Sequence, residues 1–368
     1  MSKFDQNMTI QTTFREKDIR FYSANSEYVS LHGVWYENGT YRRMPKDVAE
    51  ATNWRVAMLY THTSGARLRF CTDSPYIAVG AIYPPMEFSS PKSASLSSAG
   101  AFCFDMYADG KHCRVLLPQK TVQRGSVVSF DVEGGQYESF MSFSSKRMRE
   151  ITLCFPSFVD MSELYIGLKE GSKVEEGREY VNENGSPVVF YGSSITQGAC
   201  ASRSGNIYQN VLSRKFNFDY VNLGFAGACK AEDAIIDYLC SLDMSVLVFD
   251  YDHNTPNAEH LRRTHLPALR KLRAAHPDVP IVLMSKPNIH SGVAEAIERK
   301  NVIEDSYRAL KSESDTPVYF VDGQKIFESC DSEMMTVDNT HPTDLGFYCM
   351  AKALEGIFEE LGDYIKDN

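Results

Sequence analysis

Val188-Val189-Phe190-Tyr191-Gly192-Ser193-Ser194-Ile195-Thr196-Gln197-Gly198 is the stretch from which the fold can be worked out. Its first four residues are apolar and β-prone, as in a buried parallel strand. Small polar residues then end the strand, and a helical pattern begins near Ile207. Open α/β sheets carry their sites at the carboxyl ends of parallel strands, which makes Ser194 a candidate nucleophile. An ordinary strand-to-helix turn, in which Ser is common as a cap, explains the stretch equally well.

A base for this serine is offered far along the chain by Asp338-Asn339-Thr340-His341-Pro342. A Ser hydroxyl is a weak nucleophile until a base removes its proton. An Asp three residues before a His, in a turn stiffened by the following Pro, can bring its carboxylate to the imidazole and fix the tautomer. Ser194 and His341 both stand at strand-to-helix junctions. Because such junctions share one edge of a parallel sheet, we expect the two side chains to meet.

The second half of the chain alternates between apolar strands and longer helical patterns. The predicted strands are 188–191, 220–223, 246–249, 281–284 and 318–321. The predicted helices are 207–217, 231–241, 258–275, 292–312 and 344–361. This alternation predicts an α/β domain with a parallel sheet covered on both faces.

The first half shows a different pattern, with many short aromatic or β-branched runs separated by turn residues. The runs include 54–60, 66–71, 76–83, 101–107, 112–117, 127–132, 150–155 and 163–168. Asp109-Gly110 between two of them predicts a hairpin. The pattern favours an antiparallel β-sandwich or jelly roll. The charged segment 171–186 is the expected linker, which gives domains at 1–180 and 181–368.

Four short blocks carry a resemblance to a known family. Gly192-Ser193-Ser194-Ile195 resembles the Gly-Asp-Ser-Leu block of the SGNH (GDSL) hydrolases, and Asp338-x-x-His341-Pro342 resembles their last block. Between them, 222–227 (Asn-Leu-Gly-Phe-Ala-Gly) and 250–254 (Asp-Tyr-Asp-His-Asn) resemble the second and third blocks. The similarity is to a bacterial subgroup with Tyr-Gly-Ser-Ser-Ile-Thr-Gln-Gly at the nucleophile and an N-terminal β-domain. It implies a flavodoxin-like three-layer catalytic domain.

The resemblance implies a serine esterase and assigns roles to its residues. Ser194 would attack the ester, His341 would move the proton and Asp338 would hold His341. The oxyanion would be met by the N–H groups of Ser194 and Gly227 and by the side-chain amide of Asn254. Taken alone, Gly227 is more often a turn glycine and Asn254 a cap residue.

The resemblance also implies a substrate class, namely a small O-acyl group, acetyl first, on a carbohydrate. A short-chain lipase or thioesterase, or a carbohydrate-binding protein with a degenerate hydrolase domain, remain alternatives. The sequence departs from the family at Ser193, at Ala228-Cys229 and at 204–206 (Ser-Gly-Asn), and the last two departures bear on specificity. Arg203, in the loop after the nucleophile, is a candidate for substrate binding, although a surface Arg is the simpler interpretation.

Composition excludes several classes of partner. A formal net charge of −10 argues against nucleic acids and anionic membranes. The N-terminus shows no apolar signal-peptide core, and the nine cysteines form no Cys-x-x-Cys pair, so we expect reduced thiols and a cytoplasmic protein. No cofactor is expected, a homo-oligomer is left open, and the substrate is expected to be a small molecule or oligosaccharide ester.

Two further features have competing interpretations. Asp250, Asp252 and His253 could suggest a metal site, but no other carboxylates or imidazoles show matching spacing, so no metal is expected. The aromatic residues of the first half, among them Trp35 and Trp54, are expected to fill a core rather than to stack on sugars.

Overall fold

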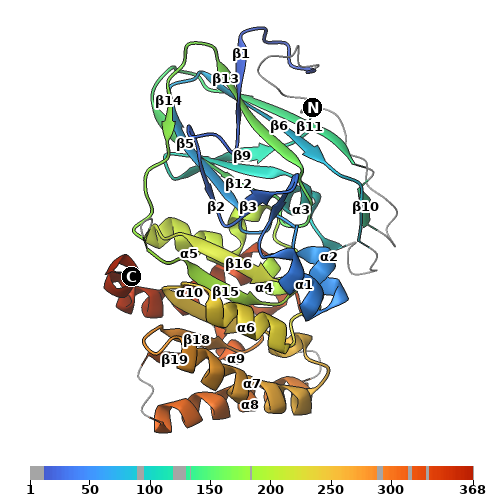
Figure 1. Cartoon of the computed structure of the whole chain (residues 1–368), viewed down its shortest axis with the longest axis vertical. Coiled ribbons are helices and arrows are strands. Elements are labelled where there is room, and N and C mark those ends of the chain that lie inside the picture. Colours follow the sequence, from blue (N-terminus) through green and yellow to red (C-terminus); the bar gives the residue numbers. More distant parts are fainter. Residues whose placement is uncertain are drawn as a thin grey trace. The chain divides into compact units, whose positions relative to one another are not determined.

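The computed structural model describes residues 12–88, 95–118, 130–132, 134–182, 185–287, 293–313, 317–328 and 331–367. The chain forms two compact units (Figure 1). The first unit comprises Met1–Arg43, Thr61–Arg178 and Arg203–Gly205. The second comprises Met44–Tyr60, Glu179–Ser202 and Asn206–Asn368. Each unit therefore takes a short segment from the other half of the sequence, and the boundary near residue 180 stays a prediction.

The first unit is built from antiparallel sheets. One sheet has the order β1 (Ile19–Ser23), β13 (Glu163–Lys169), β6 (Tyr76–Tyr83) and β11 (Gly135–Ser142). The larger sheet has the order β14 (Val174–Glu176), β5 (Arg67–Thr72), β12 (Arg149–Cys154), β8 (Phe104–Ala108) and β9 (Lys111–Leu116), with β2 (Ser30–His32) also on β5. Smaller elements are the pairs β3 (Trp35–Glu37) with β4 (Thr40–Arg42) and β7 (Met86–Phe88) with β10 (Phe130–Val132), and helix α3 (Ser98–Phe102). Within the predicted strand 127–132, residues 127–129 lie outside the described residues.

The two larger sheets share one hydrophobic core. Leu68 and Phe70 of β5 belong to the same buried cluster as Val79 of β6 and Ile166 of β13. Period-two alternation in each strand sends these side chains to one face, where burial of apolar surface stabilises the stacking of the sheets. The antiparallel β-domain predicted from the sequence is confirmed.

The predicted hairpin at Asp109-Gly110 is confirmed as the connection between β8 and β9. Both turn residues have positive φ, 52° and 72°, which is the backbone that a two-residue hairpin of matching twist requires.

The strand predicted at 54–60 is wrong. The segment forms two short helices, α1 (Lys46–Thr52) and α2 (Trp54–Leu59), which belong to the second unit. Asn53 caps α2 by accepting hydrogen bonds from the backbone N–H groups of Arg55 and Val56. Val56 and Leu59, three residues apart, are the buried side chains, so the relevant period is helical.

The second unit contains a five-stranded parallel sheet, as predicted. Its order is β16 (Tyr220–Gly224), β15 (Val188–Gly192), β17 (Val246–Asp250), β18 (Ile281–Met284) and β19 (Val318–Val321). The longer helices are α5 (Tyr208–Phe216), α6 (Asp233–Ser241), α7 (Ala258–Ala275), α8 (Val293–Ser312) and α10 (Asp344–Glu360). Short elements are α4 (Ser194–Gln197), α9 (Gly323–Ile326), α11 (Gly362–Asp367) and the 3-10 turns Ser204–Asn206, which lies mostly in the first unit, Asp252–Asn254 and Ser332–Met334.

The interior strand β15, which lies between β16 and β17, contacts both helical layers with alternate side chains. Phe190 packs against Tyr208 of α5 and Phe358 of α10. Tyr191 points to the other face and contacts Phe249, whose ring lies against His265 of α7. A strand that is buried on both faces reads as a continuous apolar run, which is why this one was recognisable in the sequence.

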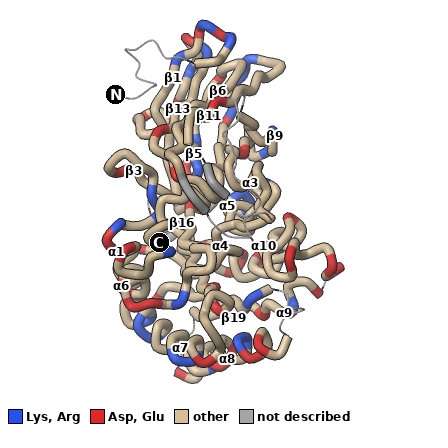
Figure 2. The backbone as a smooth tube through the Cα atoms, turned by 90° about the vertical axis from the view of Figure 1, so that its right-hand side faces the viewer, with Lys and Arg blue, Asp and Glu red and all other residues tan. Residues whose placement is uncertain are grey.

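The outer surfaces of α7 and α8 carry charges of both signs (Figure 2). Arg262 pairs with Glu259 and Glu298, and Arg270 pairs with Glu313. Among the described residues, none of the helices has the length and apolar character needed to cross a lipid bilayer. The eight cysteines of the described ranges are all free thiols, and five of them are buried.

Candidate functional site

Ser194 lies at the first turn of α4, directly after strand β15. Ser193 caps this turn by accepting a hydrogen bond from the N–H of Ile195 at 3.1 Å. Gly192 permits the turn because a Cβ there would lie 2.1 Å from Thr196 Oγ1 and 2.2 Å from the carbonyl oxygen of Asp250. The sharp turn places Ser194 at the carboxyl end of β15, the edge where the sequence predicted a site.

The hydroxyl of Ser194 meets the imidazole of His341. Ser194 Oγ lies 2.8 Å from His341 Nε2, although the two residues are 147 positions apart. On the other side of the ring, His341 Nδ1 lies 2.8 Å from Asp338 Oδ2 and 3.1 Å from Oδ1. The structure therefore brings together the three side chains singled out in the sequence, in the order of a Ser-His-Asp proton relay.

The loop that carries Asp338 and His341 is fixed by its own backbone. Asp338 Oδ1 accepts hydrogen bonds from the N–H of Thr340 at 3.2 Å and from the N–H of His341 at 2.8 Å. Asn339 between them has a φ of 61°, a left-handed conformation that Asn tolerates well in such turns. The N–H of Val337 donates to the carbonyl of His341 at 2.9 Å and closes the loop.

Electrostatics favour an ionised Asp338. Burial acts to raise the pKa of this carboxyl, but the hydrogen bonds from the backbone N–H and ring of His341 outweigh it, and the net shift is downward. An ionised carboxylate at Nδ1 keeps the proton of a neutral imidazole on that nitrogen. Nε2 is then left as the acceptor that faces Ser194.

The two other predicted oxyanion donors lie on the loops that follow β16 and β17, the strands on either side of β15. Gly227, with a φ of 67°, is in the turn after β16 in which the N–H of Ala228 donates to the carbonyl of Phe225. Asn254 follows β17, and its Oδ1 accepts a hydrogen bond from the N–H of Cys229 at 3.3 Å. With the amide oxygen engaged in this way, the NH₂ group of Asn254 is the part that can donate to a ligand. The roles of both residues stay predictions.

Arg203 belongs to the first unit and makes a partly buried ion pair there. Its Nη1 lies 2.6 Å from Oδ2 of the fully buried Asp105 and also contacts the hydroxyl of Tyr107. Neither Asp105 nor Tyr107 stands in a sequence pattern that points to Arg203, so this pairing is visible only in the structure. A role for Arg203 in substrate binding stays a prediction.

Asp250, Asp252 and His253 offer ligand atoms that lie within 4.8 Å of one another. Asp252 is already engaged, since its Oδ1 lies 2.8 Å from His253 Nδ1 and its Oδ2 accepts from the N–H of Lys286. Burial raises the pKa of Asp250 to about 7. Because Asp252 and His253 already bind each other, we assign no ion to this cluster, and the expectation that it holds no metal stays a prediction.

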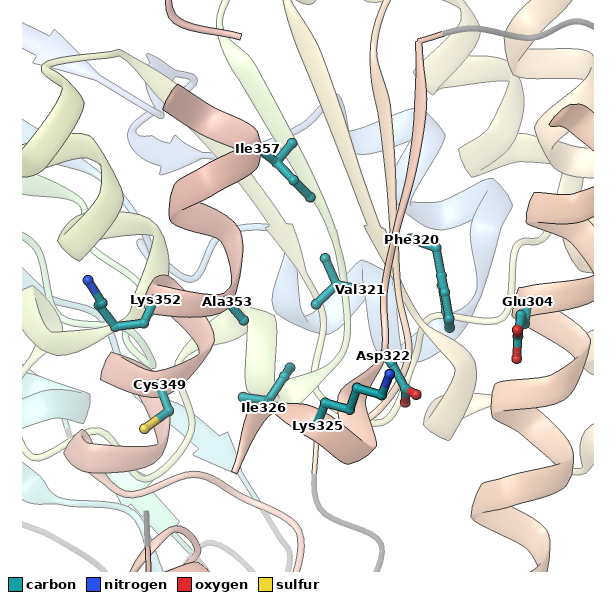
Figure 3. A pocket seen from close by; sticks show the side chains of 10 residues that line it. All are labelled: Glu304, Phe320, Val321, Asp322, Lys325, Ile326, Cys349, Lys352, Ala353 and Ile357. Atoms are coloured by element: carbon teal, nitrogen blue, oxygen red, sulfur yellow. The ribbon is translucent and has the colours of Figure 1, made fainter. Parts of the chain in front are cut away.

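A groove of about 570 Å³ lies elsewhere in the second unit, beside the edge strand β19 (Figure 3). Phe320 and Asp322 contribute to its lining, as do Lys325 of α9 and Lys352 and Ile357 of α10. None of the predicted site residues lines it. The groove is therefore not the place where Ser194 and His341 meet.

The aromatic residues divide between core and surface. Tyr41, Phe70, Phe104 and Tyr137 are fully buried in the first unit, as the core interpretation predicts. Trp54 on α2 is 73% exposed and Trp35 on β3 is 38% exposed, so for both tryptophans the core interpretation is wrong. The helical turn of α2 buries Val56 and Leu59 instead and leaves the indole in solvent.

This fold and this arrangement of Ser, His and Asp define an SGNH-type hydrolase. Residues 185–359 match the model of the GDSL-like Lipase/Acylhydrolase family, and residues 19–174 match the model described as the N-terminus of Esterase_SGNH_hydro-type, GxDLY. The chain belongs to this family of ester hydrolases and carries the N-terminal domain of its SGNH esterases. The name of this domain spells Gly-x-Asp-Leu-Tyr, and residues 103–107 (Cys-Phe-Asp-Met-Tyr) agree with it only at Asp105 and Tyr107, the two residues that hold Arg203.

Solved structures with the same fold cover nearly the whole chain. A putative GDSL-like lipase from Bacteroides ovatus ATCC 8483 is 23% identical, with a TM-score of 0.77 over 95% of this chain and 98% of that one. The salicylyl-acyltransferase SsfX3 from a tetracycline biosynthetic pathway is 18% identical, with a TM-score of 0.73 over 95% and 99%. A family two carbohydrate esterase from Cellvibrio japonicus is 12% identical, with a TM-score of 0.58 over 94% and 99%. No curated protein sequence matches the chain.

Proposed function

We propose that the protein is a serine esterase that hydrolyses small O-acyl esters, acetyl esters first, on carbohydrates. The observation that carries the proposal is the continuous contact from Ser194 Oγ to His341 Nε2 at 2.8 Å and from His341 Nδ1 to Asp338 Oδ2 at 2.8 Å. A nucleophile, a base and a group that orients the base are the three components that acyl transfer to serine needs.

The proposed reaction has two halves. Ser194 Oγ attacks the ester carbonyl carbon while His341 Nε2 takes the hydroxyl proton. The tetrahedral intermediate then collapses to an acyl-enzyme as His341 returns that proton to the departing alcohol oxygen. In the second half a water molecule attacks the acyl carbon and gives a proton to His341. The bond from the acyl carbon to Ser194 Oγ then breaks, Oγ takes that proton back from His341, and the carboxylic acid leaves. Asp338 stabilises the imidazolium in both halves.

The negative charge that develops on the carbonyl oxygen needs donors that are already in place. The N–H of Ser194 stands in the first turn of α4, where backbone donors have no intrahelical acceptor. The N–H of Gly227 and the amide NH₂ of Asn254 are the proposed second and third donors. Each such donor is worth roughly 3 kcal/mol when it is directed at the transition state.

The proposed substrate class rests on fold similarity and on the resemblance of the four sequence blocks. One of the structures that share this fold is described as a carbohydrate esterase, and another as an acyltransferase. An esterase transfers the acyl group to water, and an acyltransferase transfers it to another acceptor. The triad alone therefore does not determine which acceptor the protein uses. A long-chain lipase, a thioesterase and a non-catalytic sugar-binding protein are the alternatives that the experiment must separate.

The test is hydrolysis of p-nitrophenyl esters from acetyl to decanoyl by the wild type and by Ser194→Ala. Ser312→Ala, an exposed serine on α8, is the matched control. We expect the rate to peak at acetyl, to fall to background in Ser194→Ala and to be unchanged in the control. A peak at long chains would move the assignment to a lipase or thioesterase. No hydrolysis by the wild type would favour the sugar-binding protein.

A further inference from the structure

Helix α2 is hydrogen-bonded through its N-cap residue to the loop that carries Gly227. Asn53, its N-cap residue, donates from Nδ2 to the carbonyl oxygen of Ala228 at 3.1 Å and to Oε1 of Glu232 at 2.7 Å. Both partners follow Gly227 by a few residues, and all of them belong to the second unit. The segment from the first half of the sequence thus supplies side chains to the surroundings of the proposed oxyanion hole.

Arg55 on α2 lies against Gly227. A Cβ built on Gly227 would be 3.5 Å from Arg55 Cζ, 3.6 Å from Nε and 3.7 Å from Nη2. These are ordinary van der Waals distances, so the guanidinium group covers the face of the turn where Gly227 has no side chain. A group bound at this turn would meet the guanidinium directly.

The charge of Arg55 has no partner within the described ranges of the chain. Its guanidinium makes no hydrogen bond or ion pair there, and its Nε is buried without an acceptor. Burial is the cause that lowers the pKa of this guanidinium, with no carboxylate acting on it. Arg203 and Arg299, by contrast, are held by Asp105 and Glu295. A partly buried cation without a counter-ion is costly, and an anion at this place would remove much of the cost.

An exposed ring accompanies this cation. Trp54 is 73% exposed, and Arg55 Cζ lies 5.9 Å from the centroid of its ring. Trp side chains are enriched at interfaces, and an indole offers a flat face for a sugar or aromatic ring. Cation and ring together fit a cyclic molecule that carries a negative group.

We propose that Arg55 is a specificity-determining residue that binds a carboxylate on the ester substrate next to Gly227, with Trp54 as the surface for the ring that bears it. The proposal rests on the proposed esterase function and narrows its substrate to O-acylated acids, such as acetylated sugar acids. Arg55 takes no part in proton transfer. Its guanidinium offers the paired N–H donors that match a carboxylate.

The test compares two acetyl esters that differ in charge, 4-acetoxybenzoate and its methyl ester. We measure kcat and KM for both with the wild type, Arg55→Met and Arg55→Lys, and with Arg263→Met, an exposed arginine on α7, as the control. We expect the ratio of kcat/KM for the anionic ester to that for the neutral ester to fall about tenfold in Arg55→Met, which corresponds to about 1.4 kcal/mol. The loss should appear in KM, Arg55→Lys should restore part of it, and the control should keep the ratio of the wild type.

An unchanged ratio in Arg55→Met would overturn the proposal, whether both esters lose activity equally or neither does. Failure of the wild type to hydrolyse either ester would instead contradict the esterase function. The anion site is then tested without turnover, by calorimetry on Ser194→Ala. Tighter binding of 4-acetoxybenzoate than of its methyl ester, abolished when Arg55→Met is added, supports the site, and equal binding refutes it. Thermal melting of each variant checks that the fold is intact.

Discussion

Asp338→Asn is the substitution that most sharply separates catalysis from stability in this site. The wild-type carboxylate accepts from the N–H groups of Thr340 and His341 through Oδ1 and faces His341 Nδ1 with Oδ2. In the variant the amide oxygen can keep both backbone hydrogen bonds, so the loop retains its shape. The amide NH₂ then takes the place of Oδ2. It donates to Nδ1 and therefore selects the tautomer whose proton is on Nε2.

That tautomer directs an N–H group at Ser194 Oγ, where the reaction needs an acceptor. In enzymes with a Ser-His-Asp triad, the corresponding substitution lowers kcat by roughly 10⁴-fold, which corresponds to about 5.5 kcal/mol of transition-state stabilisation. We expect a loss of that order in kcat for p-nitrophenyl acetate, with a melting temperature within a few degrees of the wild type. The control is Asp363→Asn, a carboxylate 95% exposed on α11, which should leave both quantities unchanged. A loss smaller than about tenfold in Asp338→Asn would refute the proposed relay.

Three further predictions concern the surroundings of the triad. Asn254→Ala should lower kcat by about 10²-fold with little change in KM, since an oxyanion donor acts in the transition state; an effect confined to KM, measured on p-nitrophenyl acetate, would contradict this role. Gly192→Ala should destabilise the fold by about 3 kcal/mol or more in urea unfolding, because its Cβ would overlap Thr196 Oγ1 and a backbone oxygen. Gly356→Ala, in an open helical position, should instead stabilise it by about 1 kcal/mol. Burial raises the pKa of Asp250 to about 7 from 3.8, so the folded state keeps a proton that the unfolded state releases. Stability should therefore fall as the pH rises from 4 to 7, and melting of Asp250→Asn at pH 5 and pH 8 should lack that fall.

The catalytic half of the fold was predictable because its strands are buried on both faces. Residues 246–249 and Ile281–Met284 are unbroken apolar runs, and the amphipathic helix α7, which begins after its Asn257 cap, separates them. The segment at 54–60 was misread as a strand because aromatic and β-branched residues fit either structure over so short a run. Its helix is set by the Asn53 cap and by packing in the second unit, which the local sequence does not record.

The residues of the site also differ in whether the sequence alone could predict them. Ser194, Asp338 and His341 were found because each stands in a short local pattern with a chemical meaning. The contact of Arg55 with Gly227 could not be found, since it joins residues from the two halves of the sequence through tertiary packing alone. The ion pair between Asp105 and Arg203 was missed for the same reason, as 98 residues separate the two.

The most direct measurement is mass spectrometry of the protein after reaction with a fluorophosphonate, followed by peptide mapping. An activated serine attacks phosphorus and expels fluoride, so the adduct marks the nucleophile itself. We predict a single adduct on Ser194 that forms rapidly in the wild type and is lost in His341→Ala. An unmodified Ser194, or an adduct that forms at the same rate without His341, would contradict the assignment of this serine as the nucleophile.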